Sequence, residues 1–338
     1  MSFPDTKYMG SKQSLLPWIM GHLDALEYEV ALDAFSGSAC VAHAMKTRGK
    51  RVIANDFLQF AYHIAKATVE NNRVRLEQDD VDFLLQRNRE ASTFIRDTFR
   101  GLYFSDEDNA FLDEAYANIA ELGCEYKRSI ALAALCRACM KKRPRGIFTF
   151  TGRKGWDGRR DLTLSMREQF CEAVGAFNEA VLDNHRRNRA SCRDVFSFTV
   201  RDLDLVYIDT PYLSPHSDSD YTRRYHFVEG LCSYWAGLEV QQHTLTKKIQ
   251  SRPTSFRSTR TAEQSFARLF EHFRRVPVLV VSYSSNGVPS KDGMIQLLRC
   301  FGRKVDVAEL PHKYCFGNHK HKVGNNNNSV VEYLFIAR

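Results

Sequence analysis

The sequence predicts an α/β protein in which a mixed sheet is flanked by helices and interrupted by an inserted, mostly helical segment carrying a β-hairpin. Three observations support this fold class. Apolar runs typical of buried strands stand near both ends of the chain, and a helical stretch joins the first two of them. The middle of the chain shows helical periodicity with long polar stretches instead. The strand patterns therefore belong to one sheet that the middle segment divides.

Three of the apolar runs end in a carboxylate, at Asp33, Asp56 and Asp209. A helical stretch over residues 39–48 joins the first two runs into a strand–helix–strand unit. Open parallel sheets bind ligands outside the carboxyl ends of their strands, so we expect these acids to converge on a ligand. The runs cover residues 29–33, 51–56 and 204–209.

The remaining strands and the insertion follow from composition along the chain. Strand-like runs at 276–282, 305–308 and 330–336 complete the sheet, which assigns residues 1–73 and 188–338 to one domain. Residues 74–187 form the predicted insertion. Ser105 before three acidic residues indicates a helix start, and residues 147–158 indicate a β-hairpin or an exposed loop.

The positive charge of the chain is concentrated in one window. The 338 residues carry 48 Lys and Arg against 40 Asp and Glu, a net charge of +8. Residues 126–160, here called the basic window, hold eleven bases and one acid, so the rest of the chain is slightly negative. Interleaved Phe148, Phe150 and Trp156 favour nucleic acid over the alternative, a solvated helix face. The candidate nucleic-acid contacts are Lys141, Lys142, Arg143, Arg145, Arg153 and Lys154.

Other classes of protein are excluded by composition. We expect no membrane span, because no apolar run reaches the roughly 18–20 residues that one requires. The N-terminus predicts no secretory signal, and nine cysteines without framework spacing predict reduced thiols in a cytoplasmic protein. The Cys136–Cys139 pair and a cluster at His312, Cys315, His319 and His321 lack a convincing ligand pattern, so we expect no metal.

A glycine turn follows the first strand and predicts a cofactor pocket. Gly37 lets the chain turn sharply, but Asp33 opens the turn where a phosphate-binding loop would carry glycine. Asp56, at the end of the next strand, stands where an acid binds ribose hydroxyls. A cationic nucleoside without phosphate describes S-adenosylmethionine, although a plain strand–helix turn would leave the same pattern.

The third acid begins the four-residue run Asp209-Thr210-Pro211-Tyr212. A carboxylate, backbone carbonyls and an aromatic face on a rigid loop suit a planar base with an exocyclic amino group. Asp209 and the Thr210 carbonyl would accept the two amino hydrogens while Tyr212 stacks on the ring. Residues 221–227 could cover such a base. A plain turn is the alternative.

These motifs resemble the Dam-type, or alpha-group, adenine-specific DNA methyltransferases. Asp209-Thr210-Pro211-Tyr212 is similar to their Asp-Pro-Pro-Tyr signature and departs from it only at Thr210. The run from Asp33 to Ser38 looks like their cofactor motif, and the run from Lys7 to Lys12 resembles their Lys-aromatic-x-Gly-Gly-Lys element. Residues 192–196 resemble the Cys-x-Asp-Phe step that precedes their catalytic motif.

The resemblance implies a Rossmann-like class I methyltransferase fold, with the insertion recognising DNA. It implies that S-adenosylmethionine is the cofactor and that Asp33, Phe35 and Gly37 shape the pocket for its methionine part. Asp194 and Val195 would hold its adenine ring. Further contacts to the cofactor would come from Tyr8, Lys12, Asp56 and Asp209.

The expected reaction is methylation of adenine N6 in double-stranded DNA by base flipping and direct transfer. The expected enzyme is a monomer or weak dimer encoded by a bacterium or a phage, with a cognate restriction endonuclease as a candidate partner. Methylation of adenine in RNA and a catalytically silent nucleic-acid-binding protein are the alternatives.

Overall fold

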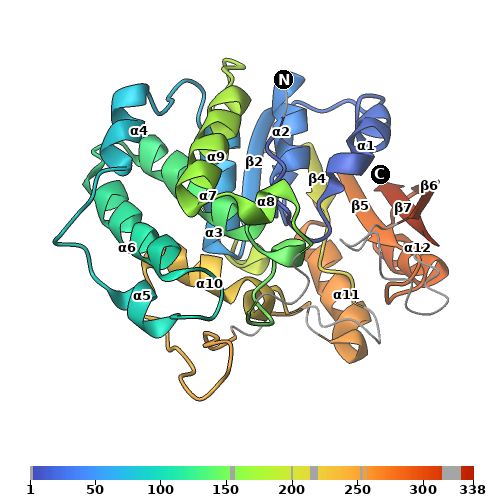
Figure 1. The fold of residues 1–338 in the computed structure, drawn as a ribbon. Coiled ribbons are helices and arrows are strands. Elements are labelled where there is room, and N and C mark those ends of the chain that lie inside the picture. The colour runs from blue at the N-terminus through green and yellow to red at the C-terminus, as the bar shows by residue number, and fades with distance from the viewer. Residues whose placement is uncertain are drawn as a thin grey trace.

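The computed structural model describes residues 3–152, 157–198, 201–213, 220–251, 254–256, 258–313 and 329–338. Within these residues, one seven-stranded sheet with the order β3-β2-β1-β4-β5-β7-β6 forms the centre of the molecule (Figure 1). The strands are β1 (Val30–Asp33), β2 (Arg51–Asp56), β3 (Arg189–Cys192), β4 (Leu205–Ile208), β5 (Val278–Ser284), β6 (Val305–Lys313) and β7 (Ser329–Ala337).

The direction of the strands creates a ligand site at one edge of the sheet. β3, β2, β1, β4 and β5 run parallel, whereas β7 lies antiparallel between β5 and β6. The chain leaves β1 for β2 and β3 on one side, and β4 lies on the other side of β1. The carboxyl ends of β1 and β4 therefore flank a topological switch point, where sheets of this kind bind ligands.

Alternating side chains of the strands build two cores. Ala31 and Val52 belong to one core, and their neighbours Leu32 and Ile53 belong to the other, as the period of two in a strand requires. The first face is covered by α1 (Leu16–Leu23), α2 (Cys40–Thr47) and α3 (Gln59–Ala65), and the second by α11 (Ala262–His272) and α12 (Lys291–Cys300). This confirms the predicted sheet with flanking helices.

Further helices extend the first core away from the sheet (Figure 1). Ser105 caps α6 by accepting a hydrogen bond from the Asp108 backbone N–H, so the predicted helix start is confirmed. α7 packs against α3, α9 and α10 and is buried along most of its length. The core is continuous from the sheet into this segment, and the domain boundaries at 74 and 187 stay a prediction. These helices are α4 (Gln78–Leu84), α5 (Phe94–Thr98), α6 (Asp106–Glu121), α7 (Glu125–Lys141), α8 (Arg160–Thr163), α9 (Met166–Ala180) and α10 (Tyr221–Ser233).

Single-turn elements join the larger ones. A π-helical turn follows α3 directly, and 3-10 turns precede α1 and α11. The turns are Lys12–Leu15, Lys66–Glu70, Pro144–Gly146, Val195–Ser197 and Thr259–Thr261. The described part of the chain contains no helix with the length and apolar character needed to cross a membrane.

The predicted β-hairpin is wrong for the residues that the structure describes. Residues 147–152 form no strand. The Phe148 ring is fully buried and stacks on Phe227 at 5.1 Å, and the Phe148 N–H donates to the Arg224 carbonyl. Alternating Thr and Phe imitates a strand, but here the rings fill holes in a helical core. Residues 153–156 of the predicted hairpin lie outside the described residues.

Candidate functional site

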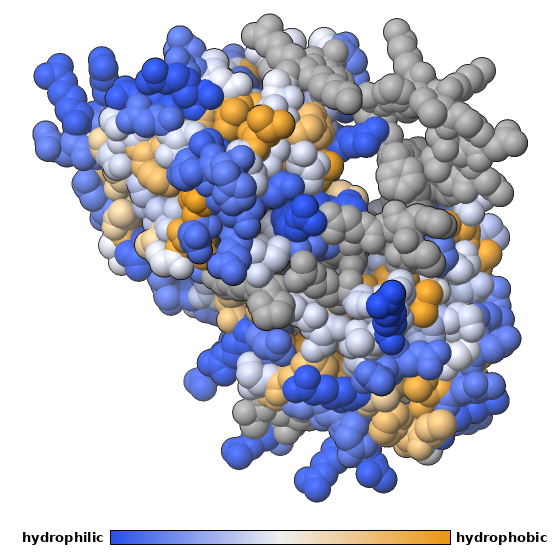
Figure 2. Space-filling view, turned by 90° about the horizontal axis from the view of Figure 1, so that it is seen from below, coloured by the Kyte–Doolittle hydropathy of each residue, from blue (hydrophilic) through white to orange (hydrophobic). Residues whose placement is uncertain are grey.

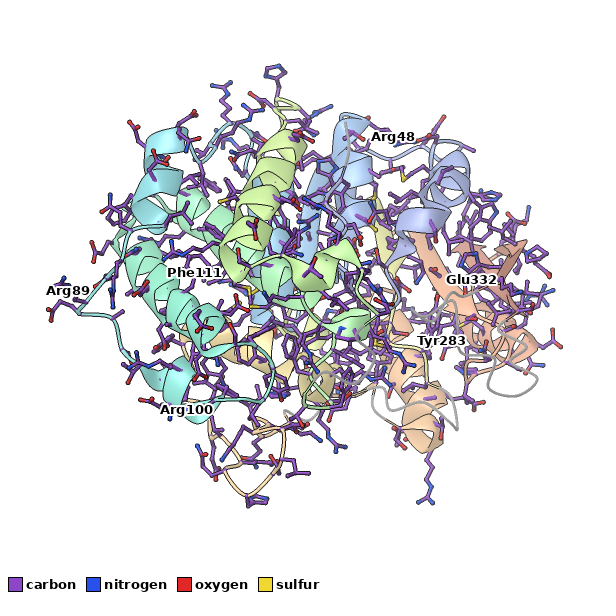
Figure 3. All side chains as sticks on the ribbon, in the orientation of Figure 1. Arg48, Arg89, Arg100, Phe111, Tyr283 and Glu332 are labelled. Atoms are coloured by element: carbon purple, nitrogen blue, oxygen red, sulfur yellow. The ribbon has the colours of Figure 1, made fainter. Side chains whose placement is uncertain are left out.

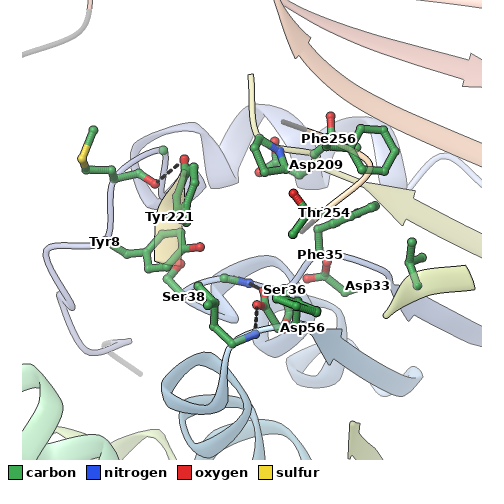
Figure 4. Close-up of a pocket in the computed structure, with 18 of the residues that line it drawn as sticks. Tyr8, Asp33, Phe35, Ser36, Ser38, Asp56, Asp209, Tyr221, Thr254 and Phe256 are labelled. Atoms are coloured by element: carbon green, nitrogen blue, oxygen red, sulfur yellow. Dashed lines mark hydrogen bonds between the residues drawn. The ribbon is translucent and has the colours of Figure 1, made fainter. Parts of the chain in front are cut away.

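A pocket lies at the carboxyl ends of β1, β2 and β4 (Figure 4). Asp33, Asp56 and Asp209 all line it, so the predicted convergence of the three acids is confirmed. With the solvent at its mouth included, the pocket has a volume of about 1170 Å³. Every residue that the sequence analysis predicts to contact the cofactor or to take part in catalysis lines this pocket. The set is Tyr8, Lys12, Asp33, Phe35, Gly37, Asp56, Asp194, Val195, Asp209, Thr210, Pro211 and Tyr212.

The turn after β1 is held by the acid at the end of β2. Asp56 accepts hydrogen bonds from the backbone N–H of Gly37 at 2.7 Å and of Leu58 at 2.9 Å. Gly37 has a φ of +49°, and a Cβ there would lie 2.8 Å from Cε1 of Tyr8. Glycine is therefore required on two grounds, since the backbone is left-handed and the tyrosine ring leaves no space for a side chain.

Asp33 is the most deeply buried acid of the three, at 1% exposure. Burial raises its pKa well above the usual range, and the nearby charges of Asp209 and Asp56 raise it further. Its Oδ1 has no hydrogen-bond partner among the described residues. A carboxyl group in this condition is stabilised by a cationic ligand, which would supply both a donor and a compensating charge.

Aromatic packing fixes the N-terminal segment over the pocket. The Tyr8 ring stacks on Tyr225 at 5.4 Å and lies 5.6 Å from the ring of Tyr221. The Met9 N–H donates to the Tyr225 hydroxyl at 2.7 Å. The Tyr221 hydroxyl donates to the Met9 carbonyl at 3.3 Å (Figure 4). α10 therefore positions this wall, and its first residue, Tyr221, itself lines the cavity.

Four polar side chains meet at the end of β4. Lys12 Nζ lies 2.8 Å from Asp209 Oδ1 and 4.7 Å from the centre of the Tyr212 ring. The Tyr212 hydroxyl donates to Glu332 Oε2 at 2.9 Å. Glu332 is fully buried on β7, and β7 pairs with β5, which carries Tyr283 (Figure 3). The Tyr283 ring packs edge-on against Tyr212. Residues far apart in sequence thus hold the tyrosine ring in place.

The carboxyl group of Asp209 titrates close to neutrality. Burial raises its pKa to about 6, with Glu332 adding to the rise, while the Lys12 ammonium opposes it. Asp209 therefore has a pKa at which it is mostly ionised at pH 7, and it needs Lys12 for that. An ionised carboxylate in a buried place is a strong hydrogen-bond acceptor.

The opposite wall of the pocket is apolar. Asp194 accepts from the Phe196 N–H at 2.8 Å and so opens the turn that carries Val195 and Phe196. The Phe256 ring packs edge-on against Phe35 at 5.4 Å and parallel to Phe196 at 6.4 Å. A flat aromatic ligand fits such a wall.

Several lining residues were missed by the sequence predictions. Thr254, Ser255 and Phe256 reach the pocket from a segment that carries no strand, helix or motif signal. Glu332, which contacts the lining residue Tyr212, was also missed; it lies within an apolar strand run, where an isolated acid was the available signal.

Two of the predicted DNA contacts are corrected by the structure. Lys142 is buried and pairs with Asp108 at 2.8 Å. The guanidinium of Arg143 is buried and donates to the carbonyls of Phe150 at 2.6 Å and Gly152 at 3.2 Å. Because these charges serve contacts inside the protein, neither side chain is available to a phosphate group.

The other four candidates differ in their surroundings. Lys141 is mostly buried and pairs with Asp161 at 3.1 Å, whereas Arg145 is exposed. Arg153 and Lys154 lie outside the described residues. For metal, no group of three His, Cys, Asp or Glu side chains in the described ranges could hold an ion. Of the cluster His312, Cys315, His319 and His321, only His312 falls within the described ranges.

A family model described as D12 class N6 adenine-specific DNA methyltransferase matches residues 8–278. Type II methyltransferase M2.HphI of Haemophilus parahaemolyticus is 30% identical over 325 residues, covering 92% of this chain and 92% of that protein. Modification methylase StsI of Streptococcus sanguinis is 25% identical and type II methyltransferase M.FokI of Planomicrobium okeanokoites is 24% identical. Each of these two alignments covers 98% of this chain and 52% of the other protein.

Proposed function

The chain belongs to the D12 class of N6 adenine-specific DNA methyltransferases, and on this premise we propose how its pocket serves the reaction. We propose that S-adenosylmethionine is the methyl donor and that it shares the pocket with the target adenine. The convergence of Asp33, Asp56 and the Lys12–Asp209 pair in one cavity carries this proposal. The assignment to the alpha group within the family stays a prediction.

The chemistry of the lining residues fits S-adenosylmethionine. Asp33, with an unpaired oxygen among the described residues, would bind the cationic amino group beside the Gly37 turn. Asp56 would accept ribose hydroxyls with its remaining lone pairs. Asp194 and Val195, beside the apolar wall, would hold the adenine ring, and Phe35 would help to shape the place of the methionine part. When bound, this cofactor supplies a methyl group on a positively charged sulfur.

The reacting amino group would be held by the residues after β4. The Asp209 carboxylate and the Thr210 carbonyl would each accept one N6 hydrogen, which leaves the nitrogen lone pair directed away from the ring. Tyr212, fixed by Glu332, would stack on the base. Threonine offers the same backbone carbonyl as the proline of the common motif, so we expect Thr210 to support catalysis.

Asp209 would also receive the proton that N6 loses on methylation. Its pKa of about 6 leaves it ionised before the reaction and basic enough to hold a proton briefly. Lys12 keeps the carboxylate charged and in position. Positioning and electrostatics account for the acceleration, and no covalent enzyme intermediate is needed.

The DNA would be flipped at adenine and contacted by the exposed part of the basic window. Arg145 is the described candidate, with Lys141 at the margin, and Arg153 and Lys154 remain proposals. Phosphate contacts of this kind weaken steeply with salt. We further propose that the protein is a monomer or a weak dimer. We also propose a cognate endonuclease as its partner, since the relative M2.HphI is named a type II methyltransferase.

Methyl transfer from labelled cofactor tests the proposal. The protein is incubated with methyl-labelled S-adenosylmethionine and either duplex DNA or RNA, and the nucleic acid is digested to nucleosides. Label in N6-methyladenosine from RNA, or no transfer to either polymer, would contradict the proposal. Label in N6-methyl-deoxyadenosine from DNA is the expected result.

A further inference from the structure

Leu245 is the one large hydrophobic side chain that stands fully in solvent within the described ranges, at 87% exposure. It occupies the tip of the loop Val240–Ile249, here called the finger. The finger contains two glutamines, a histidine and two lysines but no acidic residue. A single exposed leucine is common on protein surfaces and needs no functional explanation when its loop is mobile. Leu245 therefore indicates a binding role only if the finger is ordered.

Hydrogen bonds hold the finger in a defined shape. Val240 and Ile249 form an antiparallel bridge at its base, where Ile249 is buried. Toward the tip, the Gln241 N–H donates to the Lys248 carbonyl at 2.7 Å. The Thr244 N–H donates to the Gln241 carbonyl at 3.0 Å. Leu245 is therefore presented to solvent by an ordered backbone, so little backbone freedom remains to be lost when the finger binds.

The finger is fastened to the same framework as the pocket. The Tyr103 hydroxyl lies 2.5 Å from the Thr246 carbonyl and 3.1 Å from the Phe148 carbonyl. It also contacts His226 of α10 at 3.0 Å. α10 begins at the pocket wall, and Phe148 follows the exposed Arg145 of the basic window by three residues. One tyrosine thus links the finger, α10 and the predicted DNA-contacting segment.

The three features lie at one end of the molecule. In Figure 1 the finger extends below α5 and α10, at the end where the segment after α7 also turns. Figure 2 views this end, where blue and white cover much of the described surface and several orange patches lie between them. One leucine side chain cannot by itself supply the several hundred Å² of contiguous apolar area that a stable protein interface buries. Insertion between two bases requires one apolar side chain.

We propose that the finger inserts Leu245 into the DNA base stack near the target adenine, while Lys247 and Lys248 lie along the backbone. The inference rests on the proposed function, because it presumes that the substrate is duplex DNA. Flipping a base leaves a gap and unstacks its neighbours, and a leucine side chain placed there stabilises the opened duplex. The finger therefore stabilises the flipped state of the target base and does not contribute to binding of the cofactor.

The test compares Leu245→Ala with Leu245→Met, which keeps the length and apolar character of the side chain. Both are measured with duplexes carrying the recognised site, in which 2-aminopurine replaces each base flanking the target in turn. We expect Leu245→Ala to lower kcat/KM about tenfold, as loss of one buried leucine predicts. It should also abolish the fluorescence rise at one flanking base, and Leu245→Met should retain both.

The outcomes separate this inference from the proposed function. If the wild-type protein methylates DNA and Leu245→Ala matches it in rate and in fluorescence at every flanking base, the finger is not a wedge. An effect of Leu245→Ala confined to the sedimentation behaviour of the protein would indicate a protein contact and overturn the inference. If the wild-type protein transfers no methyl group to DNA, the proposed function fails first. Unchanged thermal unfolding of the variants controls for folding.

Discussion

The acid edge of the sheet and the basic window both concentrate charge, yet the fold uses them in opposite ways. Asp33, Asp56 and Asp209 are delivered to one cavity, because parallel strands end at a common edge. In the basic window, Lys142 and Arg143 turn inward, and their charges satisfy a carboxylate and backbone carbonyls. The strand pattern therefore predicts that the acids lie together in the structure. Counting the basic residues of the basic window does not predict which of them face solvent.

The two regions share one physical requirement. A buried charge is tolerated where partners compensate for its lost hydration. Asp209 has Lys12, and Arg143 has three carbonyl groups and the rings of Tyr103 and Phe150 beside its guanidinium. Variants that remove one charge or one partner distinguish the two kinds of region. In the pocket they should change activity, whereas at Arg143 they should change the free energy of unfolding.

The largest change in stability is expected for Arg143→Met. Removing the guanidinium leaves the carbonyls of Phe150 and Gly152 without their donors, at a cost of about 3 kcal/mol in the free energy of unfolding. Denaturant unfolding measures this loss. Arg145→Met is the matched control, because its exposed side chain should change stability by less than about 0.5 kcal/mol. Equal losses in both variants would mean that Arg143 has no special structural role.

A smaller but diagnostic effect is expected for Lys12→Gln. The pKa of Asp209 is about 6, so kcat/KM of the wild type should rise with pH through this value as the carboxylate ionises. Loss of the ammonium raises that pKa, which moves the acid limb to higher pH and lowers the rate at pH 6 by roughly thirtyfold. The pH–rate profile measures both effects. An unshifted limb in Lys12→Gln would show that Lys12 does not tune Asp209.

Tyr212→Phe tests the contribution of Glu332. The ring is kept for stacking, but the hydrogen bond of 2.9 Å to the buried carboxylate is lost. We expect kcat to fall about fivefold, with the affinity for cofactor unchanged. Glu332→Gln, which can still accept the hydrogen bond, should retain more activity than Tyr212→Phe. If Glu332→Gln were the more damaging of the two, the charge of Glu332 and not its hydrogen bond would matter.

The smallest effect is expected for Arg145→Ala. One lost phosphate contact should weaken DNA binding about threefold at moderate salt and reduce the salt dependence by about one unit of slope. Binding titrations at several salt concentrations measure the slope. Arg48→Ala, at the exposed residue that follows α2, serves as a control for the general loss of charge. An unchanged slope in Arg145→Ala would remove Arg145 from the interface.

Much of the sheet was predictable from the sequence, and the reasons are local. β1, β2, β4, β5 and β7 each contain an uninterrupted run of apolar residues, so their pattern identifies them. β3, residues Arg189–Cys192, carries mostly polar and small side chains and gave no such signal. β6 continues to Lys313 with alternating exposed residues, which lengthens a strand that the sequence ended at Ala308.

The residues of the site that follow strands in recognisable motifs were predictable from the sequence. The residues that reach the site only through tertiary packing were not. Asp33, Gly37 and Asp209 are found from strand ends and turn chemistry. Glu332 contacts Tyr212 across 120 residues of sequence, and Phe256 arrives from a segment without regular structure. Neither contact has a local signature, since both depend on how distant segments pack.

Single-turnover methyl transfer by Asp209→Asn tests the central claim most directly. The variant keeps the shape of the side chain but removes its charge, so it should bind DNA and S-adenosylmethionine yet transfer methyl groups about a thousandfold more slowly. Asp306→Asn, an exposed acid on β6 paired with Arg338, should transfer at the wild-type rate. A wild-type rate in Asp209→Asn would contradict the assignment of this carboxylate to the adenine amino group.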